Sequence, residues 1–178
     1  MKFEIIEKIG EGNRGEVYKI KLKMGEIAAL KYAKNYEIGK EWQILKFLNG
    51  FYAPKPIYKN KKFFIMEYIE GKSLKELQNT PEYYDALKYA LKAAFYLDEK
   101  KIFHKQLGRY YHIIFNGKNV KFIDFERSVI SKSPRNFLQI IGYYLKRDKL
   151  LDQSKIDFLL NLYFKDKKRS LIEILKLF

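Results

Sequence analysis

A glycine-rich segment, Gly10 to Val17, stands out among the residues whose types and spacing could do chemistry, and it reads Gly-Glu-Gly-Asn-Arg-Gly-Glu-Val. Lys31 follows Gly15 by 16 residues, and Asp124 ends an apolar stretch much further along the chain. Glycines let main-chain N–H groups approach phosphate oxygens, a lysine can neutralise those phosphates, and an aspartate is a hard-oxygen ligand that suits Mg²⁺. The order of the three predicts a clamp for nucleotide phosphates with a metal ion beside it.

Strands on both sides position the glycine segment. Residues 3–9, 16–23 and 26–34 are strand-like, and Met24-Gly25 marks a tight turn between the last two. The segment therefore connects two strands, which separates it from the Rossmann and Walker loops that lead into a helix. Lys31 falls on the third strand, from which it can reach bound phosphates.

A helix predicted over residues 39–48 carries an acid on its apolar face. Glu41 lies in line with Ile38 and Leu45 at the spacing of one helix face. An acid in an apolar stripe needs a partner, because burying an unpaired charge is costly. Lys31 can be that partner, and the pairing would hold its ammonium group in place.

The rest of the chain is predicted to be mainly helical. A capping box at Ser73 and Glu76 starts a short helix, and Pro81 starts a longer one. Asn116-Gly117 predicts a hairpin whose second strand ends just before Asp124. Further strands are predicted at 57–59 and 63–68, and further helices at 135–146, 155–164 and 170–177, the last with a capping box at Ser170 and Glu173.

The composition excludes several kinds of site and favours anionic partners. No cysteine is present, which excludes disulfides and thiolate metal sites, and two histidines are too few for a histidine cage. No apolar run approaches membrane-spanning length and no signal peptide is evident, so we expect a cytoplasmic protein with no membrane partner. The net charge of +15 favours polyanions, namely nucleotide phosphates, RNA or a ribonucleoprotein surface.

The order of these elements resembles the protein-kinase superfamily. Gly10–Val17 matches the family's G-x-G-x-x-G-x-V, Ala28–Lys31 is similar to V-A-I-K, and the helix around Glu41 is similar to the one that supplies the paired glutamate. The resemblance implies an α+β, bilobal fold. Its N-lobe, residues 1–68, would be a five-stranded antiparallel sheet plus one helix, and its C-lobe, residues 69–178, would be shortened and mostly helical.

The same resemblance implies where ATP would bind. Residues 64–68 are similar to the segment that lines the adenine pocket, so Met66 would be the gatekeeper, and the main chain of Glu67 and Ile69 would meet the adenine edge. ATP and Mg²⁺ are the implied cofactors. The implied nucleotide-binding residues are Gly10, Gly12, Gly15, Val17, Ala29, Lys31, Glu41, Met66, Glu67 and Ile69.

The second lobe departs from the family pattern. His104-Lys105-Gln106-Leu107 stands where the family has H-R-D-L, so an amide replaces the usual catalytic base, and Asp124-Phe125-Glu126 replaces D-F-G. The family's metal-binding asparagine corresponds to Tyr111 or, with one inserted residue, to His112. Only 54 residues (178 − 124) follow Asp124, which leaves no long activation loop. The implied catalytic residues are Gln106, Lys31 and Asp124, and the implied metal ligands are Asp124 and His112.

This shortened lobe is most like three groups of small atypical kinases. They are the RIO family, the small kinase of the tRNA-modifying KEOPS complex, and predicted archaeal serine/threonine kinases. The pattern formed by His104–Leu107, Arg109 and His112 is most similar to the last group.

Several functions stay open. The first is an ATP-dependent atypical serine/threonine-type kinase with an unknown protein acceptor, slow or ATPase-like, because a glutamine can orient a hydroxyl but cannot take its proton. The second is a pseudokinase that senses nucleotide, and the third is a basic RNA- or ribosome-associated module. A small-molecule kinase fits less well, because those families carry an aspartate where Gln106 stands.

Overall fold

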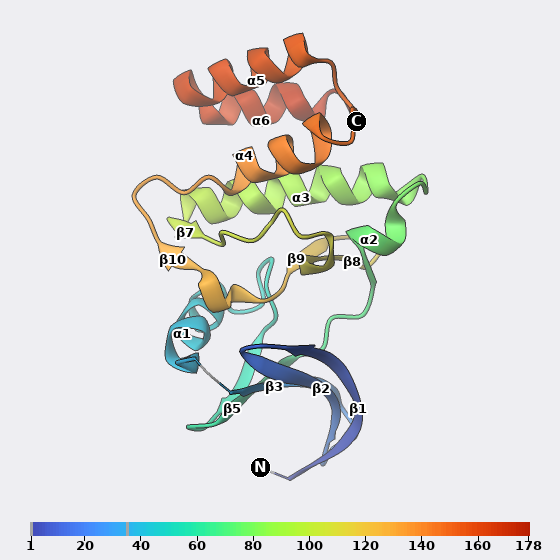
Figure 1. Cartoon of the computed structure of the whole chain (residues 1–178), viewed down its shortest axis with the longest axis vertical. Helices are drawn as coiled ribbons and strands as arrows, with labels where there is room; N and C mark the ends of the chain where they lie inside the picture. The colour runs from blue at the N-terminus through green and yellow to red at the C-terminus, as the bar shows by residue number, and fades with distance from the viewer. Residues whose placement is uncertain (1, 35) are drawn as a thin grey trace. The chain divides into compact units, whose positions relative to one another are not determined.

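A computed structural model describes residues 2–34 and 36–178 of the chain (Figure 1). The chain divides into two compact units. The first comprises Met1–Glu70 and Ile123–Glu126, and the second comprises Gly71–Phe122 and Arg127–Phe178. The fold is α+β, as the sequence predicts. Within the described residues, no helix is both long and apolar enough to cross a membrane.

The first unit is a five-stranded antiparallel sheet with one helix, α1 (Ile38–Leu48). The order of the strands is β1-β2-β3-β5-β4, and each pairs antiparallel with its neighbour. The predicted apolar face of α1 is buried, with Glu41 in it. The strands are β1 (Phe3–Gly12), β2 (Gly15–Leu22), β3 (Ile27–Ala33), β4 (Pro56–Lys59) and β5 (Phe63–Glu67).

The glycine segment is a strand hairpin rather than a loop between strands, which corrects the expectation from the sequence. β1 extends to Gly12 and β2 begins at Gly15, so these two residues pair and only Asn13 and Arg14 form the turn. Gly15 is the glycine that the fold demands, because an added Cβ would overlap the main-chain oxygen of Tyr32. A Cβ at Gly12 would meet nothing within 4 Å. Packing within the fold therefore requires glycine at position 15 but not at position 12.

The second unit is mainly helical, and its long helix α3 (Glu82–Glu99) lies along α4 (Asn136–Ile140), while α5 (Gln153–Lys165) and α6 (Lys167–Leu175) pack side by side (Figure 1). The inward face of α3 is fully buried and consists of Leu87, Ala90, Leu91, Ala94 and Leu97. The smaller elements of the second unit are β6 (Lys72–Ser73), α2 (Leu74–Leu77), β7 (Ile102–Phe103), η1 (Tyr110–His112), β8 (Ile113–Phe115), β9 (Val120–Phe122), β10 (Val129–Ile130) and η3 (Ile141–Lys146).

The capping box predicted at the start of α2 is confirmed. The hydroxyl of Ser73 accepts from the N–H of Glu76, and the Glu76 carboxylate accepts from the N–H of Ser73. Two helical N–H groups that would otherwise lack partners are satisfied in this way.

The capping box predicted at Ser170 is wrong. α6 begins earlier, at Lys167, where the Asp166 carboxylate accepts from the N–H of Arg169. Ser170 is buried inside the helix and donates its hydroxyl to the carbonyl of Leu159 in α5. Aspartate and serine cap helices about equally well, so Asp166, about one turn earlier, can serve as the N-cap in place of Ser170.

The helix predicted over residues 135–146 is continuous but changes type. Its first part is α4, and its second part, η3, is a π-helix that spans Ile141–Lys146. A π-helix bonds each N–H five residues back and so has a wider turn, which changes the direction in which its side chains point.

Candidate functional site

Lys31 is the centre of a buried charged cluster in the first unit. β3 places it in register with Val17 of β2, and only 6% of its surface is exposed. Its ammonium nitrogen lies 3.0 Å from each carboxylate oxygen of Glu41 and 2.7 Å from Oδ1 of Asp124. Burial lowers the pKa of Lys31, but the charges of Glu41 and Asp124 outweigh it and raise the pKa above its ordinary value. The predicted pairing of Lys31 with Glu41 is confirmed.

Glu41 joins the helix to the other parts of this cluster. Besides Lys31, its carboxylate accepts from the hydroxyl of Tyr36 at 2.7 Å and from the N–H of Phe125 at 3.1 Å. Burial and the charge of Glu41 raise the pKa of Tyr36, which therefore stays a donor. Sequence reasoning missed Tyr36, because nothing in its type or spacing distinguishes it from the other tyrosines of the chain.

Asp124 is held in an unusual main-chain conformation. Its φ angle is 64°, in the left-handed region that few residues other than glycine adopt. Such conformations cost of order 1–3 kcal/mol and cluster at functional sites. The side chain keeps 26% of its surface exposed although Oδ1 accepts from Lys31. An ion from solvent can therefore reach this carboxylate.

Glu126 adds a second acid beside Asp124. Its carboxylate lies 3.9 Å from the ammonium nitrogen of Lys31 and 3.9 Å from Nε of Arg14 in the hairpin turn. Burial and the charge of Asp124 raise the pKa of Glu126. The sequence shows Glu126 only as a departure from D-F-G, although an acid two residues after Asp124 was a signal that could have identified it.

The residues of the first unit fit a hard divalent cation. Glu41, Asp124 and Glu126 carry three negative charges against the two positive charges of Lys31 and Arg14, and oxygen donors are the ligands that Mg²⁺ prefers. Within the described residues no group of three or more His, Cys, Asp or Glu forms a ready-made cage. Mg²⁺ commonly binds through one or two carboxylates with phosphates and water completing the shell.

The residues expected at the adenine pocket lie on β3, β5 and the segment that follows. Ala29 is in register with Met66, and both are buried. The N–H of Glu67 donates to the carbonyl of Lys55, so this N–H is already used. In the described part of the chain, the main-chain N–H and C=O of Ile69 make no hydrogen bond. Ile69 thus offers unused main-chain groups at this edge.

Gln106 and His112 belong to the second unit, and each is only 8% exposed. The N–H of Gln106 donates to Nδ1 of His104 at 3.4 Å, and the rings of His104 and His112 lie 5.9 Å apart between centroids. Among the described residues, the side-chain oxygen of Gln106 has no hydrogen-bond partner. A buried acceptor without a donor costs about 1–3 kcal/mol, which makes a site for an incoming donor.

A polar network holds the start of the Gln106 loop. Asp98 of α3 is buried, and it accepts from the N–H and the side-chain amide of Asn136 at 2.9 and 2.7 Å. The Asn136 side chain in turn donates to the carbonyl of Ile102 and accepts from the N–H of His104. Burial raises the pKa of Asp98, while these donors oppose that rise. Sequence reasoning missed this network, because its bonds join Asn136 to residues 32 to 38 positions earlier in the chain.

The π-helix η3 supports the end of the same loop. Tyr144 donates its hydroxyl to the carbonyl of Leu107, and the ring of Tyr143 lies so close to Gly108 that an added Cβ would come within 2.7 Å of it. Tyr110 donates to the carboxylate of Asp148, just beyond η3. The loop that carries Gln106 is therefore braced by main-chain and tyrosine contacts.

Comparison with known proteins places the chain in a family. Residues 13–148, more than half of the chain, match a family model described as the RIO domain. The chain is also 32% identical over 87 residues to calmodulin-binding receptor-like cytoplasmic kinase 1 of Arabidopsis thaliana, covering 42% of this chain and 18% of that protein. Of the three small atypical groups that the sequence resembles, the family model identifies the RIO group. The chain belongs to the RIO domain family of atypical, protein-kinase-like proteins.

Proposed function

We propose that this protein binds Mg²⁺-ATP and acts as a slow, atypical serine/threonine-type kinase. The observation that carries the proposal is the buried cluster in which Lys31 meets both Glu41 and Asp124. A lysine fixed by a glutamate and placed beside a metal-binding aspartate is the arrangement that protein kinases use on the α- and β-phosphates of ATP. The acceptor would be a hydroxyl of an unidentified protein.

Lys31 would exchange partners when nucleotide binds. It now donates to Oδ1 of Asp124, an oxygen that suits a metal ion. Asp124, with Glu126 beside it, would hold Mg²⁺, which when bound neutralises phosphate charge. The ammonium group of Lys31 would then turn to the phosphates while Glu41 keeps it in place. The excess of acid in the cluster is the electrostatic reason for the exchange.

The β1–β2 hairpin would cover the phosphates. A Cβ at Gly12 meets nothing within 4 Å, so the fold itself does not require glycine there. Glycine is needed where main chain approaches a ligand closely, which explains Gly12 by nucleotide binding and not by folding. The unused main-chain groups of Ile69 would meet the adenine edge.

Gln106 is assigned to the acceptor hydroxyl. The attacking oxygen would form a bond to the γ-phosphorus while the bond to the β,γ-bridging oxygen breaks and ADP leaves. Because the transition state is loose in most analyses, little proton transfer is needed early, and orientation supplies much of the rate. The oxygen of Gln106 can accept from the hydroxyl and so orient it, but the proton must end on a phosphate oxygen or in solvent. Slow turnover follows.

Radiolabelled ATP tests the transfer step. We expect slow transfer of the γ-phosphate to the protein itself or to water in the wild type, and faster transfer in Gln106→Asp, because an aspartate can accept the proton. Lys31→Met serves as the control for contaminating kinases. Undetectable turnover in both wild type and Gln106→Asp would rule out a kinase.

A nucleotide sensor without turnover is the second candidate. The observation in its favour is Gln106, since an amide cannot serve as a base. This candidate shares the ATP site and differs only in chemistry. Binding of Mg²⁺-ATP without any release of labelled phosphate would support it.

A further inference from the structure

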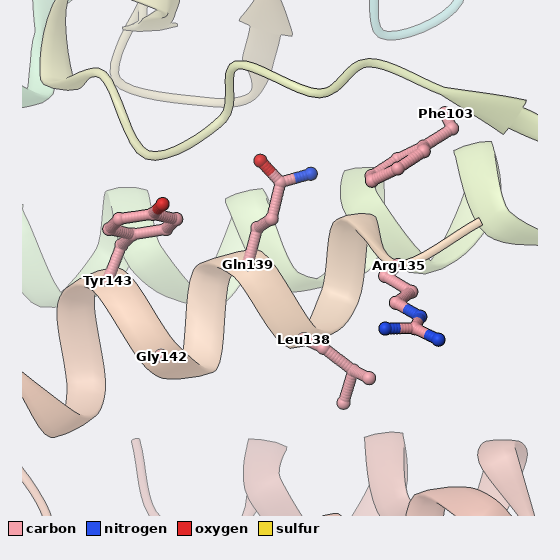
Figure 2. A pocket seen from close by; sticks show the side chains of 6 residues that line it. All are labelled: Phe103, Arg135, Leu138, Gln139, Gly142 and Tyr143. Atoms are coloured by element: carbon pink, nitrogen blue, oxygen red, sulfur yellow. The ribbon is translucent and has the colours of Figure 1, made fainter. Parts of the chain in front are cut away.

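A hollow of about 480 Å³ lies on the surface of the second unit, open to solvent along one side. One wall is a single face of the α4–η3 segment, because its residues recur three and four positions apart. The other wall is Phe103 of β7 (Figure 2). We call this hollow the α4–η3 groove, and it is lined by Phe103, Arg135, Leu138, Gln139, Gly142 and Tyr143.

The α4–η3 groove has aromatic side chains towards its two ends and an open space over Gly142. The ring of Tyr143 stands towards one end in Figure 2 and the ring of Phe103 towards the other, while the side chain of Leu138 points to the opposite side of the helix. A Cβ added at Gly142 would meet nothing within 4 Å, so no neighbouring atom occupies the space above it. Aromatic rings beside an open space favour an apolar side chain from a ligand.

Two polar groups of the groove could bind a ligand. The amide of Gln139 lies between the two rings in Figure 2, and within the described residues its buried nitrogen has no acceptor. The last torsion of a glutamine is soft, so the amide can turn towards the groove. Arg135 is exposed, and no carboxylate of residues 2–34 or 36–178 pairs with its guanidinium. The groove thus offers one neutral donor and one cation.

The length of the groove suits an extended chain. The lining residues run from Arg135 to Tyr143, and eight steps at the α-helical rise of 1.5 Å measure at most about 12 Å, because the π-helical part rises less per residue. An extended peptide covers that distance in about four residues at 3.3 Å each. The volume also falls in the range of about 300–1,000 Å³ that is usual for ligand pockets.

We propose that the α4–η3 groove binds a short, extended, acidic segment of a partner protein. An apolar side chain of the segment fills the open space over Gly142, a main-chain carbonyl accepts from Gln139, and an aspartate or glutamate pairs with Arg135. The charge balance of the chain, 36 basic against 21 acidic residues, favours an acidic partner. The inference lies entirely within the second unit and does not depend on nucleotide binding.

Peptide titration of the full-length chain tests this assignment. The probe is acetyl-Ala-Leu-Glu-Ala-amide, added to ¹⁵N-labelled protein while the side-chain amide signal of Gln139 is followed. We expect saturable shifts at Gln139 and Gly142, and about fivefold weaker binding of the matched peptide with glutamine in place of glutamate. Arg135→Gln should remove that difference. Equal affinity of the two peptides for the wild type would overturn the proposal.

Three variants separate the groove from general binding. Gly142→Leu should fill the groove and abolish the shifts at Gln139, whereas Gly142→Ala should retain binding within about twofold. Gln139→Leu should melt no lower than the wild type, because it removes an unsatisfied buried donor, yet bind the peptide more weakly. Unchanged binding in folded Gly142→Leu contradicts the groove. Phenylacetate binding as tightly as the peptide would assign the groove to a small carboxylate and overturn the peptide.

Discussion

The Lys31 cluster of the first unit and the Gln106 loop of the second unit differ in the kind of contact that holds them in place. In the cluster every charge has a partner, and Lys31 is shared by Glu41 and Asp124. The Gln106 loop carries no charged base, and it is braced by neutral contacts from Asn136 and Tyr144. Because the two regions are held by different contacts, we expect that mutations can separate the binding of a charged ligand from the transfer of its phosphate.

The largest effect is expected when the Lys31 cluster is broken. Lys31→Met leaves Glu41 buried beside an apolar side chain, and we expect a loss of about 3–5 kcal/mol in the free energy of unfolding. Urea denaturation measures it. The double variant Lys31→Met with Glu41→Gln removes the orphaned charge and should recover part of the loss. A double variant no more stable than the single one would show that charge pairing is not what holds the cluster.

Loss of the Asp98–Asn136 network in the second unit should lower stability without lowering the affinity for nucleotide. Asp98→Ala deprives Asn136 of its acceptor, and we expect a loss of about 3 kcal/mol in the free energy of unfolding. Where the variant remains folded, its affinity for Mg²⁺-ATP should stay within about twofold of the wild type. Calorimetric titration measures that affinity, and a loss above tenfold would mean that the two regions are not separable.

Substitutions at Gly15 and Gly12 of the hairpin should affect stability and nucleotide affinity, respectively. Gly15→Ala forces a Cβ into the main chain of Tyr32, and we expect a loss of about 1–3 kcal/mol in the free energy of unfolding. Gly12→Ala meets nothing within 4 Å, so its stability should change by less than about 0.5 kcal/mol while affinity for Mg²⁺-ATP falls. Thermal denaturation with and without nucleotide measures both. Gly12→Ala binding as tightly as the wild type would remove Gly12 from the phosphate site.

The smallest effect concerns the pH dependence of stability. The pKa of Glu126 is raised in the folded state, so between its unfolded value and its raised value the folded state binds more protons. The contribution of Glu126 to stability therefore improves as pH falls through the raised pKa, and it is least favourable at neutral pH. Glu126→Gln should gain stability at pH 7 and lose this part of the pH dependence. Denaturation of both proteins between pH 7 and pH 5 measures the difference, and parallel curves would contradict it.

Local patterns predicted the parts of the molecule whose causes are local. The strands of the sheet follow from their residue types, and the buried face of α1 follows from helical periodicity, which also marked Glu41 as needing a partner. The glycine hairpin was predicted in place but not in extent, because glycines can continue a strand as well as end it.

The missed features depend on residues far apart in the sequence. The Asp98–Asn136 bond joins residues 38 positions apart, and the hydroxyl of Tyr144 reaches Leu107 across 37. No local signal announces such pairs. The change to a π-helix at Ile141 is missed for the same reason, since its tyrosines find their contacts in another loop.

Thermal denaturation with Mg²⁺-ATP tests the central claim most directly, because the claim is that Asp124 and Lys31 form a metal-nucleotide site. The account predicts that saturating Mg²⁺-ATP raises the Tm of the wild type by several degrees, that ATP with excess EDTA raises it less, and that Asp124→Ala abolishes the metal-dependent part. A shift of equal size in wild type and Asp124→Ala, or no shift in the folded wild type, would contradict it.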